Sequence, residues 1–230
     1  TFLDVGQGDA TLIELPDGQT VLIDGGPSYR RLDMGRAVIG PYLWNQGIRR
    51  LDHVVATHPQ WDHVGGLPWV LRTFEVGQYW DNGVSRPERF FSQLHSAVKS
   101  AGLQEQTTAA GTEIVSPGSC SLTVLSPSRS QGTEGYRSDT VSSGKDLNNR
   151  SLVTRLECGA HSFLLTADAE QQSLDGLLHV PNGLSARVVK VPHHGAKSSL
   201  SREWVNRLQA EVMVVSVGAH NRYGHPAPEV

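Results

Sequence analysis

The segment THPQWDHVGG, residues 57–66, places two imidazoles and one carboxylate within six positions. His58, Asp62 and His63 are residue types that bind Zn²⁺, Mn²⁺ or Fe²⁺. Their spacing fits an irregular loop that turns into a helix, because on a regular helix His63 would point away from the other two. The glycine pair that ends the segment would let the backbone pack closely behind such a site. We therefore expect a metal site here rather than an ordinary polar loop.

The same residue types recur at the ends of other apolar runs. Asp24 ends LIDGG, Asp168 ends SFLLTAD, His193 and His194 follow ARVVKVP, and His225 follows EVMVVSVGAHNRYG. Each one alone is more often a cap or a turn residue than a ligand. Together they favour a site, because open α/β sheets build their sites at the ends of strands.

The elements that must position these residues are short. Runs of four to eight apolar residues, bounded by Gly, Pro, Asp or Asn, predict strands at TFLDV, ATLIEL, TVLID, LDHVVAT, VGQYWD, CSLTVLSP, SLVTRL, SFLLTAD, ARVVKVP and EVMVVSVG. Helices are expected at about residues 33–46, 64–74, 86–101, 168–178 and 200–209.

Hairpins followed by strand–helix–strand occur twice in this order, which predicts two similar halves. Each half would be a mixed sheet with helices on its outer face. The predicted fold class is α/β, a four-layer αββα sandwich. A Rossmann fold fits less well, because too many strands follow one another through tight turns.

Composition sets the remaining bounds. The 230 residues are 38% hydrophobic and 19% charged, which predicts one globular domain, 1–230. The net charge of −3 provides no global basic field, so a nucleic acid would be held locally or through metal ions. No apolar stretch approaches the roughly 20 residues that span a bilayer. Because the chain begins inside a strand-like run, we expect a domain excised from a larger protein.

Two further features leave alternatives open. Cys120 and Cys158 lie in strand-like runs, where buried thiols are the favoured interpretation and a disulfide is the alternative. Residues 126–150 are rich in Ser, Gly and charge, which is typical of a disordered connection or of a binding loop.

The motifs together resemble a known family. HPQWDHVGG resembles the metallo-β-lactamase signature His-x-His-x-Asp-His, LIDGG its preceding strand-end aspartate, and LLTAD its bridging aspartate. TFLDVGQGDATLIELPDGQTVLIDGG, VPHHGAKSSLS and SVGAHNRYGHPAPEV resemble, within that superfamily, the soluble domain of ComEC-type competence proteins. The resemblance covers nearly the whole chain and keeps the order of the motifs. It implies the αββα fold, with the metal site at one edge between the halves.

The resemblance also implies roles for single residues. One metal would be bound by Asp62, His63 and His225, another by His58 and one of His193 and His194, with His194 favoured, and Asp168 would bridge. Asp62, His193 and Asn149 are expected to take part in catalysis, with His193 in a supporting or proton-donating role. Residues expected to border the site or contact substrate are Asp24, Gln7, Asp9, Asn148, Arg222 and Tyr223.

The sequence departs from the superfamily pattern at two places. Gln60 replaces a second histidine of the signature, and LNNRSLV stands where a further histidine is expected, offering Asn148 or Asn149 instead. One or two divalent ions are therefore expected. Fewer imidazoles and more oxygen donors favour Mn²⁺ over Zn²⁺.

The resemblance implies a metal-dependent nuclease that hydrolyses DNA. Its expected role is to degrade the strand that is not imported during natural transformation, on the outer face of a bacterial inner membrane. The expected partners are single-stranded DNA and the membrane channel and other domains of the parent protein. The alternatives are a metallo-hydrolase acting on another ester and a non-catalytic DNA-binding domain.

Basic and aromatic residues add candidates for contacts with DNA. Solvated surface charge is the commoner role for such arginines and lysines, and packing is at least as common for Trp61. The candidates for phosphate contacts are Arg30, Arg31, Arg49, Arg50, Lys190, Lys197 and Arg222, and those for base stacking are Trp61 and Tyr223.

Overall fold

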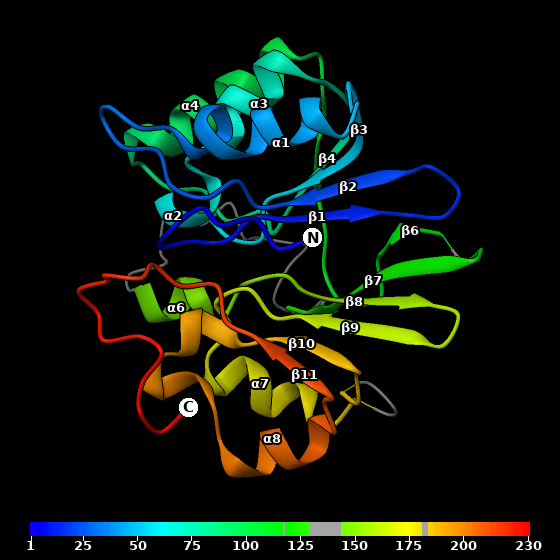
Figure 1. The fold of residues 1–230 in the computed structure, drawn as a ribbon, viewed down its shortest axis with the longest axis vertical. Helices are drawn as coiled ribbons and strands as arrows, with labels where there is room; N and C mark the ends of the chain where they lie inside the picture. The colour runs from blue at the N-terminus through cyan, green and yellow to red at the C-terminus, as the bar shows by residue number, and fades with distance from the viewer. Residues whose placement is uncertain (117, 129–143, 181–183) are drawn as a thin grey trace. The chain divides into compact units, whose positions relative to one another are not determined.

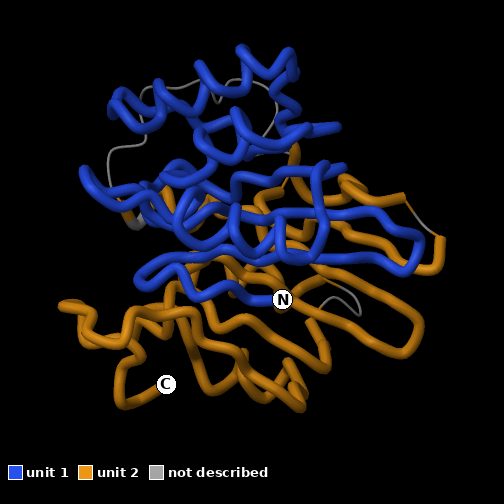
Figure 2. Tube along the Cα trace, turned by 45° about the horizontal axis from the view of Figure 1, so that its top comes forward, with its two compact units in different colours: residues 1–107, 137–139 blue, residues 108–136, 140–230 orange. Residues whose placement is uncertain are grey.

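The computed structural model describes residues 1–116, 118–128, 144–180 and 184–230. The chain divides into two compact units, one containing residues 1–107 and the other the described residues from 108 on (Figure 2). Each unit holds one mixed β-sheet with helices beside it (Figure 1). The repeated layout predicted from the order of the elements is therefore confirmed.

The sheet of the first unit has the strand order β1-β2-β3-β4-β5. Its strands are β1 (Thr11–Glu14), β2 (Thr20–Ile23), β3 (Arg50–Val55), β4 (Glu75–Asp81) and β5 (Glu105–Thr107). β1 and β2 form an antiparallel hairpin, and the later strands add in parallel. Because the carboxyl ends of parallel strands meet at one edge, the residues that follow β2, β3 and β4 lie along that edge.

Helices cover the first unit's core. They are η1 (Gly35–Ile39, π-helical), α1 (Gly40–Asn45), α2 (Trp61–Val64), α3 (Leu67–Thr73) and α4 (Arg89–Ser100). α4 buries Phe91, Leu94, Ala97 and Val98, which recur at helical spacing and join the core cluster with Leu51 and Val54 of β3. The helices predicted at residues 33–46, 64–74 and 86–101 are thus confirmed.

The run TFLDV is not a strand, contrary to the prediction. Phe2 forms an isolated bridge with Thr11, and the backbone bonds beside it end where the N–H of Leu3 donates to the carbonyl of Ala10 at 2.9 Å. The chain turns instead at Gly6, whose φ is +74°, and the backbone N–H of Asp9 donates to the carbonyl of Asp62 at 3.2 Å. The run therefore leads into a turn that packs on α2 rather than extending the sheet.

The sheet of the second unit has the order β11-β10-β9-β8-β7-β6. Its strands are β6 (Glu113–Val115), β7 (Cys120–Ser126), β8 (Val153–Cys158), β9 (His161–Leu165), β10 (Val188–Lys190) and β11 (Val212–Val214). β6 to β9 are antiparallel neighbours, whereas β9, β10 and β11 run parallel. The parallel part again brings strand ends together at one edge.

The helical segments of the second unit are α6 (Gly144–Asn148), α7 (Gln171–Leu177), η2 (Pro192–Gly195), η3 (Lys197–Ser199) and α8 (Arg202–Leu208). The Ser201 hydroxyl caps α8 by accepting from the N–H of Trp204 at 3.2 Å. Trp204 and Leu208 pack with Leu174 of α7 in this unit's core. Of the stretch 126–150, residues 129–143 lie outside the described residues.

Two cysteines form a disulfide, which corrects the favoured interpretation as buried thiols. Cys120 of β7 and Cys158 of β8 are direct partners across the antiparallel pair, with Cα atoms 4.2 Å apart. Sequence patterns alone did not indicate this register. Among the helices of the described residues, none has the length and apolar character needed to cross a membrane.

Replacing both cysteines by alanine should lower the free energy of unfolding by about 2–4 kcal/mol, because the crosslink restricts the unfolded chain. The bond closes a segment with a sequence separation of 38 residues. Urea unfolding followed by circular dichroism measures the loss, and reduced wild-type protein should match the double variant. Equal midpoints under oxidising and reducing conditions would contradict the prediction.

Candidate metal centre

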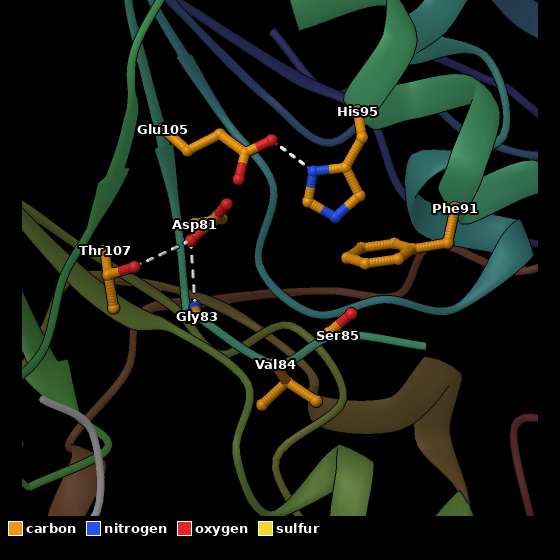
Figure 3. Close-up of a pocket in the computed structure, with 8 residues that line it drawn as sticks. All are labelled: Asp81, Gly83, Val84, Ser85, Phe91, His95, Glu105 and Thr107. Carbon is orange, nitrogen blue, oxygen red and sulfur yellow. Dashed lines mark hydrogen bonds and ion pairs between the residues drawn. The ribbon is translucent and has the colours of Figure 1, made fainter. Parts of the chain in front are cut away.

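A cavity of about 320 Å³ lies at the carboxyl ends of β4 and β5 in the first unit. Phe91 and His95 project into it from α4 toward Glu105 and Asp81 (Figure 3). His95 forms an ion pair with Glu105, and burial raises the pKa of Asp81. Glu105 is thus paired with His95, and Asp81 accepts from the backbone N–H of Gly83 at 2.8 Å, so these groups already have partners within the first unit. The strand-end residues singled out in the sequence are therefore the stronger candidates for chemistry.

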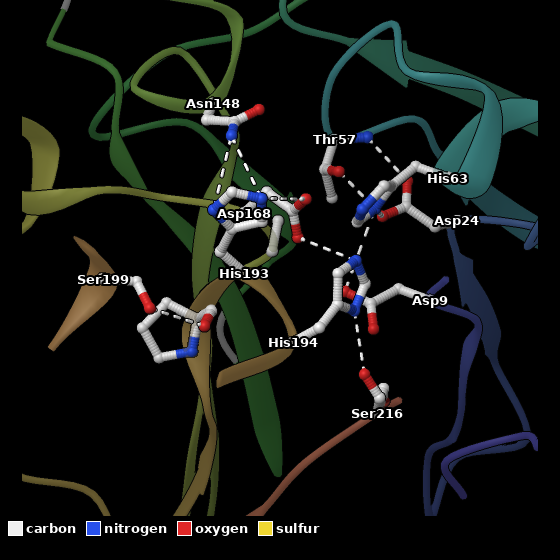
Figure 4. Close-up of polar contacts among 12 residues, drawn as sticks. Asp9, Asp24, Thr57, His63, Asn148, Asp168, His193, His194, Ser199 and Ser216 are labelled. Atoms are coloured by element: carbon white, nitrogen blue, oxygen red, sulfur yellow. Dashed lines mark hydrogen bonds and ion pairs between the residues drawn. The ribbon is translucent and has the colours of Figure 1, made fainter. Parts of the chain in front are cut away.

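Asp24 organises the strand-end residues of the first unit (Figure 4). It follows β2 with a left-handed φ of +60°, and its side chain is buried. Its Oδ1 accepts from the backbone N–H of Thr57 at 2.9 Å, and its Oδ2 accepts from the Thr57 hydroxyl and from Nδ1 of His63, both at 2.7 Å. One carboxylate thus fixes the loop after β3 and the helix α2.

These contacts determine the protonation of two imidazoles. A carboxylate only accepts, so the Nδ1 of His63 carries the proton that it shares with Asp24. The Thr57 hydroxyl donates to Asp24, so it accepts from the Nδ1 of His58 at 3.0 Å. In both histidines the Nε2 atom then holds the lone pair. Metal-binding histidines are oriented by such contacts at their other nitrogen.

The turn around Gly8 packs against the backbone of Asp62. A Cβ atom at Gly8 would lie 2.2 Å from the carbonyl oxygen of Asp62, so only glycine fits there. The turn also brings the buried Asp9 to the site, where its Oδ2 lies 3.8 Å from Nδ1 of His63. Gln7 lies in the same turn and is half-buried. The turn thus borders α2, which carries Asp62 and His63.

The glycine pair behind the loop serves the packing role that the sequence suggested. A Cβ atom at Gly65 would lie 2.5 Å from the amide nitrogen of Ser28, and one at Gly66 would lie 2.2 Å from the carbonyl oxygen of Gly25. The loop itself passes His58 and enters α2, which contains Asp62 and His63. The predicted loop-to-helix geometry is confirmed.

In the second unit Asp168 is the central carboxylate. It follows β9 after Ala167, whose φ is +46°, and it is buried. Its Oδ1 lies 3.5 Å from Nε2 of His194, and its Oδ2 lies 3.8 Å from Nε2 of His193. Both histidines have left-handed backbones, with φ of 54° and 47°. Strain of this kind at strand ends is common at functional sites.

The imidazole of His194 is oriented like those of His58 and His63. Its Nδ1 donates to the backbone carbonyl of Ser216 at 2.8 Å, which leaves the lone pair on Nε2. That nitrogen faces Asp168. The geometry agrees with the preference for His194 over His193 as a ligand.

His193 also contacts Asn148, as Figure 4 shows, and Glu170. Its Nδ1 lies 3.2 Å from Oε1 of the buried Glu170, and the same oxygen accepts from Nδ2 of Asn148 at 3.0 Å. Nδ2 of Asn148 is also 3.4 Å from Nε2 of His193. Asn149, in contrast, accepts from the N–H of Ser173 at the start of α7. Asn148 thus lies against His193, and Asn149 lies against α7.

His225 completes the group in the second unit. Its ring centroid lies 5.7 Å from that of His193, and its backbone N–H donates to Oδ1 of Asn221 at 3.0 Å. Burial lowers the pKa of His225. The neutral imidazole, which is the metal-binding form, is therefore favoured at neutral pH. Tyr223 stacks on this ring at 5.8 Å.

Three residues of these networks were not predicted from the sequence. They are Thr57, Glu170 and Ser216, which hold His58, His193 and His194 respectively. Glu170 lies two residues after Asp168. Its burial would have marked it, since a buried carboxylate needs a partner, but the sequence does not show burial. Ser216 acts through its backbone carbonyl, which no residue type reveals.

A family model of the metallo-beta-lactamase superfamily matches residues 3–125, which is more than half of the 230-residue chain. The chain belongs to the metallo-beta-lactamase superfamily. The predicted fold class, two mixed sheets with helices in a metallo-β-lactamase-like α/β protein, is thereby confirmed.

Curated relatives of this superfamily member bear out the resemblance to competence proteins. Over its full length the chain is 30% identical to ComE operon protein 3 of Bacillus subtilis and 27% identical to competence protein ComA of Neisseria gonorrhoeae. It spans 29% of the length of the former and 28% of the latter. Human tRNase Z, short form, shares the fold with a TM-score of 0.53 and 10% identity, over 95% of this chain and 92% of that one.

The donor set of this metallo-β-lactamase domain fits a divalent metal ion. In the first unit, ligand atoms of Asp9, Asp24 and His63 lie within 4.8 Å of one another. Both oxygens of Asp24 accept hydrogen bonds, so we assign Asp24 to orienting His63 rather than to binding. In the second unit, Asp168 faces an imidazole nitrogen on each side. Carboxylates and neutral imidazoles are the usual ligands of Zn²⁺ and Mn²⁺.

The candidate phosphate contacts divide into compensated and exposed charges. Lys190 is buried and its Nζ donates to the carbonyl of Ala167 at 3.1 Å, so the suggested contact with DNA was wrong and Lys190 supports the backbone before Asp168. Two other candidates are paired with acidic side chains: Arg50 with Asp52 and Glu75, and Lys197 with Glu229. Arg222 lies over the ring of Tyr223, 5.2 Å from its centroid, beside His225.

Proposed function

We propose that this domain hydrolyses phosphodiester bonds of DNA with one or two divalent metal ions. The orientation of three imidazoles carries the proposal: His58, His63 and His194 each hold a proton on Nδ1 against Thr57, Asp24 or Ser216, and so keep a lone pair on Nε2. A folded protein has little reason to buttress three buried histidines in this way unless Nε2 binds a metal.

The ligands follow the motif of the superfamily. We propose that Asp62, His63 and His225 bind one ion, that His58 and His194 bind the other, and that Asp168 belongs to both. Gln60 replaces the second histidine of the signature, so fewer imidazoles are offered than in the usual pattern. Oxygen donors then make up a larger share of the set, which favours Mn²⁺, with Zn²⁺ as the alternative.

The bound ions would supply positive charge that polarises the phosphodiester and favours the ionised form of water. The chain's own residues supply the proton chemistry. Glu170 accepts from Nδ1 of His193, while Asn148 holds Glu170 in place. We propose that His193 donates its Nε2 proton to the departing alkoxide, as an imidazolium held by a carboxylate does in hydrolytic triads.

DNA is the proposed substrate because the relatives include a protein named for competence. The domain would degrade the strand that is not imported, as one domain, 1–230, of a larger membrane protein. The disulfide between Cys120 and Cys158 supports a place on the outer side of the inner membrane, since such bonds persist in oxidising compartments.

Metal-free protein incubated with end-labelled single-stranded DNA and with bis(4-nitrophenyl) phosphate tests the proposal. Cleavage of both should require an added ion, with Mn²⁺ at least as effective as Zn²⁺ or Mg²⁺, and should stop on adding a chelator. Binding of metal without cleavage of either substrate would overturn the hydrolytic assignment. Cleavage of the small diester but not of DNA would overturn DNA as the substrate.

A further inference from the structure

The segment Ser28–Asp33 in the first unit forms a tight turn with two arginines at its tip. The N–H of Tyr29 donates to the carbonyl of Leu32 at 2.6 Å, and the N–H of Leu32 donates back at 3.3 Å. Ser28 and Asp33 form a bridge, and the Ser28 hydroxyl donates to Oδ2 of Asp33 at 2.8 Å. These bonds hold the turn in one shape, so the two residues between Tyr29 and Leu32 are presented on a fixed base.

Those two residues, Arg30 and Arg31, are uncompensated cations. Both are exposed, and neither forms an ion pair or hydrogen bond with any residue in 1–116, 118–128, 144–180 or 184–230. Arg50, in contrast, is neutralised by nearby carboxylates. Two adjacent exposed guanidinium groups on an otherwise acidic chain make a local site for anions.

Aromatic side chains stand at the base of the turn. Tyr29 is 47% exposed, and its ring contacts that of Trp61 edge-on, with centroids 5.0 Å apart. Trp61 is the first residue of α2 and directly precedes Asp62. An exposed ring beside exposed arginines is the combination that binds single-stranded nucleic acid, because bases stack on the ring and phosphates pair with the cations.

The backbone of the turn packs against the segments that carry the proposed metal ligands. A Cβ atom at Gly65 would lie 2.5 Å from the amide nitrogen of Ser28, and one at Gly8 would lie 2.9 Å from Cδ of Pro27. The backbone of the turn therefore packs directly on α2, which carries Asp62 and His63, and on the turn at Gly8. A DNA strand bound at the tip of the turn would therefore lie beside α2, which carries these ligands.

We propose that Arg30, Arg31 and Tyr29 form a subsite that holds single-stranded DNA beside Asp62 and His63. The arginines pair with consecutive phosphates and Tyr29 stacks on an unpaired base, with Trp61 supporting the ring. This inference rests on the proposed function, because it names where the substrate of that same site is held.

The test is the affinity for a fluorescent oligothymidine, measured by anisotropy with metal omitted so that no cleavage occurs. Arg30→Ala/Arg31→Ala should weaken binding at least about tenfold near 0.1 M salt. The slope of log K against log salt should become shallower by about 1.4, which corresponds to two phosphates of a single strand. Tyr29→Ala should weaken binding about five- to 50-fold without changing that slope. Tyr29→Trp should bind with the wild-type affinity, because the indole ring also stacks on bases.

A matched pair of arginines provides the control. Arg202→Ala/Arg207→Ala removes the same number of exposed charges from α8 and should leave affinity and slope unchanged. Wild-type affinity and slope in Arg30→Ala/Arg31→Ala would overturn the subsite, as would an equal loss in the control. Since binding is measured without metal, this result is independent of hydrolysis. Failure of the wild type to cleave DNA with metal counts against the proposed function and not against the subsite.

Discussion

Asp168→Ala should reduce hydrolysis of DNA and of bis(4-nitrophenyl) phosphate by at least about a thousandfold, a loss of the size seen when a main electrostatic group of an active site is removed. Asp168 is the carboxylate that faces Nε2 of both His193 and His194, at 3.8 Å and 3.5 Å. It is buried just beyond the end of β9. Metal stoichiometry should fall together with activity.

The matched control for this variant is Asp175→Ala, which removes an exposed carboxylate from α7 in the same unit. It should keep wild-type turnover and metal content. Circular dichroism of both variants checks that the fold is intact. Wild-type turnover in Asp168→Ala would contradict the catalytic assignment of this residue. Lost metal with an intact spectrum in Asp168→Ala alone would support it.

Asp24→Ala should weaken metal binding by about 10- to 100-fold although Asp24 is not assigned as a ligand, because the partners of ligating histidines tune their orientation and basicity. The variant removes the acceptor of three hydrogen bonds, from Thr57 N, Thr57 Oγ1 and His63 Nδ1. It should also lower the free energy of unfolding by about 2–4 kcal/mol, since buried donors lose their partner. Competition with a chelator measures the affinity.

Two further variants separate positioning from ligation. Asp17→Ala, in the exposed β1–β2 turn, is the matched control and should leave metal affinity unchanged. Thr57→Val keeps the size of the side chain but removes the acceptor for Nδ1 of His58, and should give a smaller loss than Asp24→Ala. Recovery of turnover at saturating metal is expected of a positioning residue. Unchanged metal affinity in Asp24→Ala would show that metal binding does not need Asp24 to orient His63.

Local patterns determined much of this protein from the sequence alone. Short β-branched runs bounded by Gly, Pro, Asp or Asn are strand signals that depend on nearby residues only, and they located most strands. The helical patterns between them located all five predicted helices. The segment around His58, Asp62 and His63 was recognisable because metal binding restricts residue type and spacing together. The strand-end positions of Asp24, Asp168 and His194 could be read in the same way.

Only the tertiary structure decided which groups hold these residues. Asp24 and Thr57 are 33 positions apart, and His194 meets the carbonyl of Ser216 across 22 positions, so no local pattern records either contact. The pairing of Cys120 with Cys158 depends on the register between β7 and β8. Lys190 and Arg31 are both basic residues that the sequence offers as phosphate contacts. In the structure Lys190 is buried against a carbonyl, whereas Arg31 is exposed at a turn. Burial, register and partners at long range are properties of the packed chain, because they depend on which surfaces exclude water together.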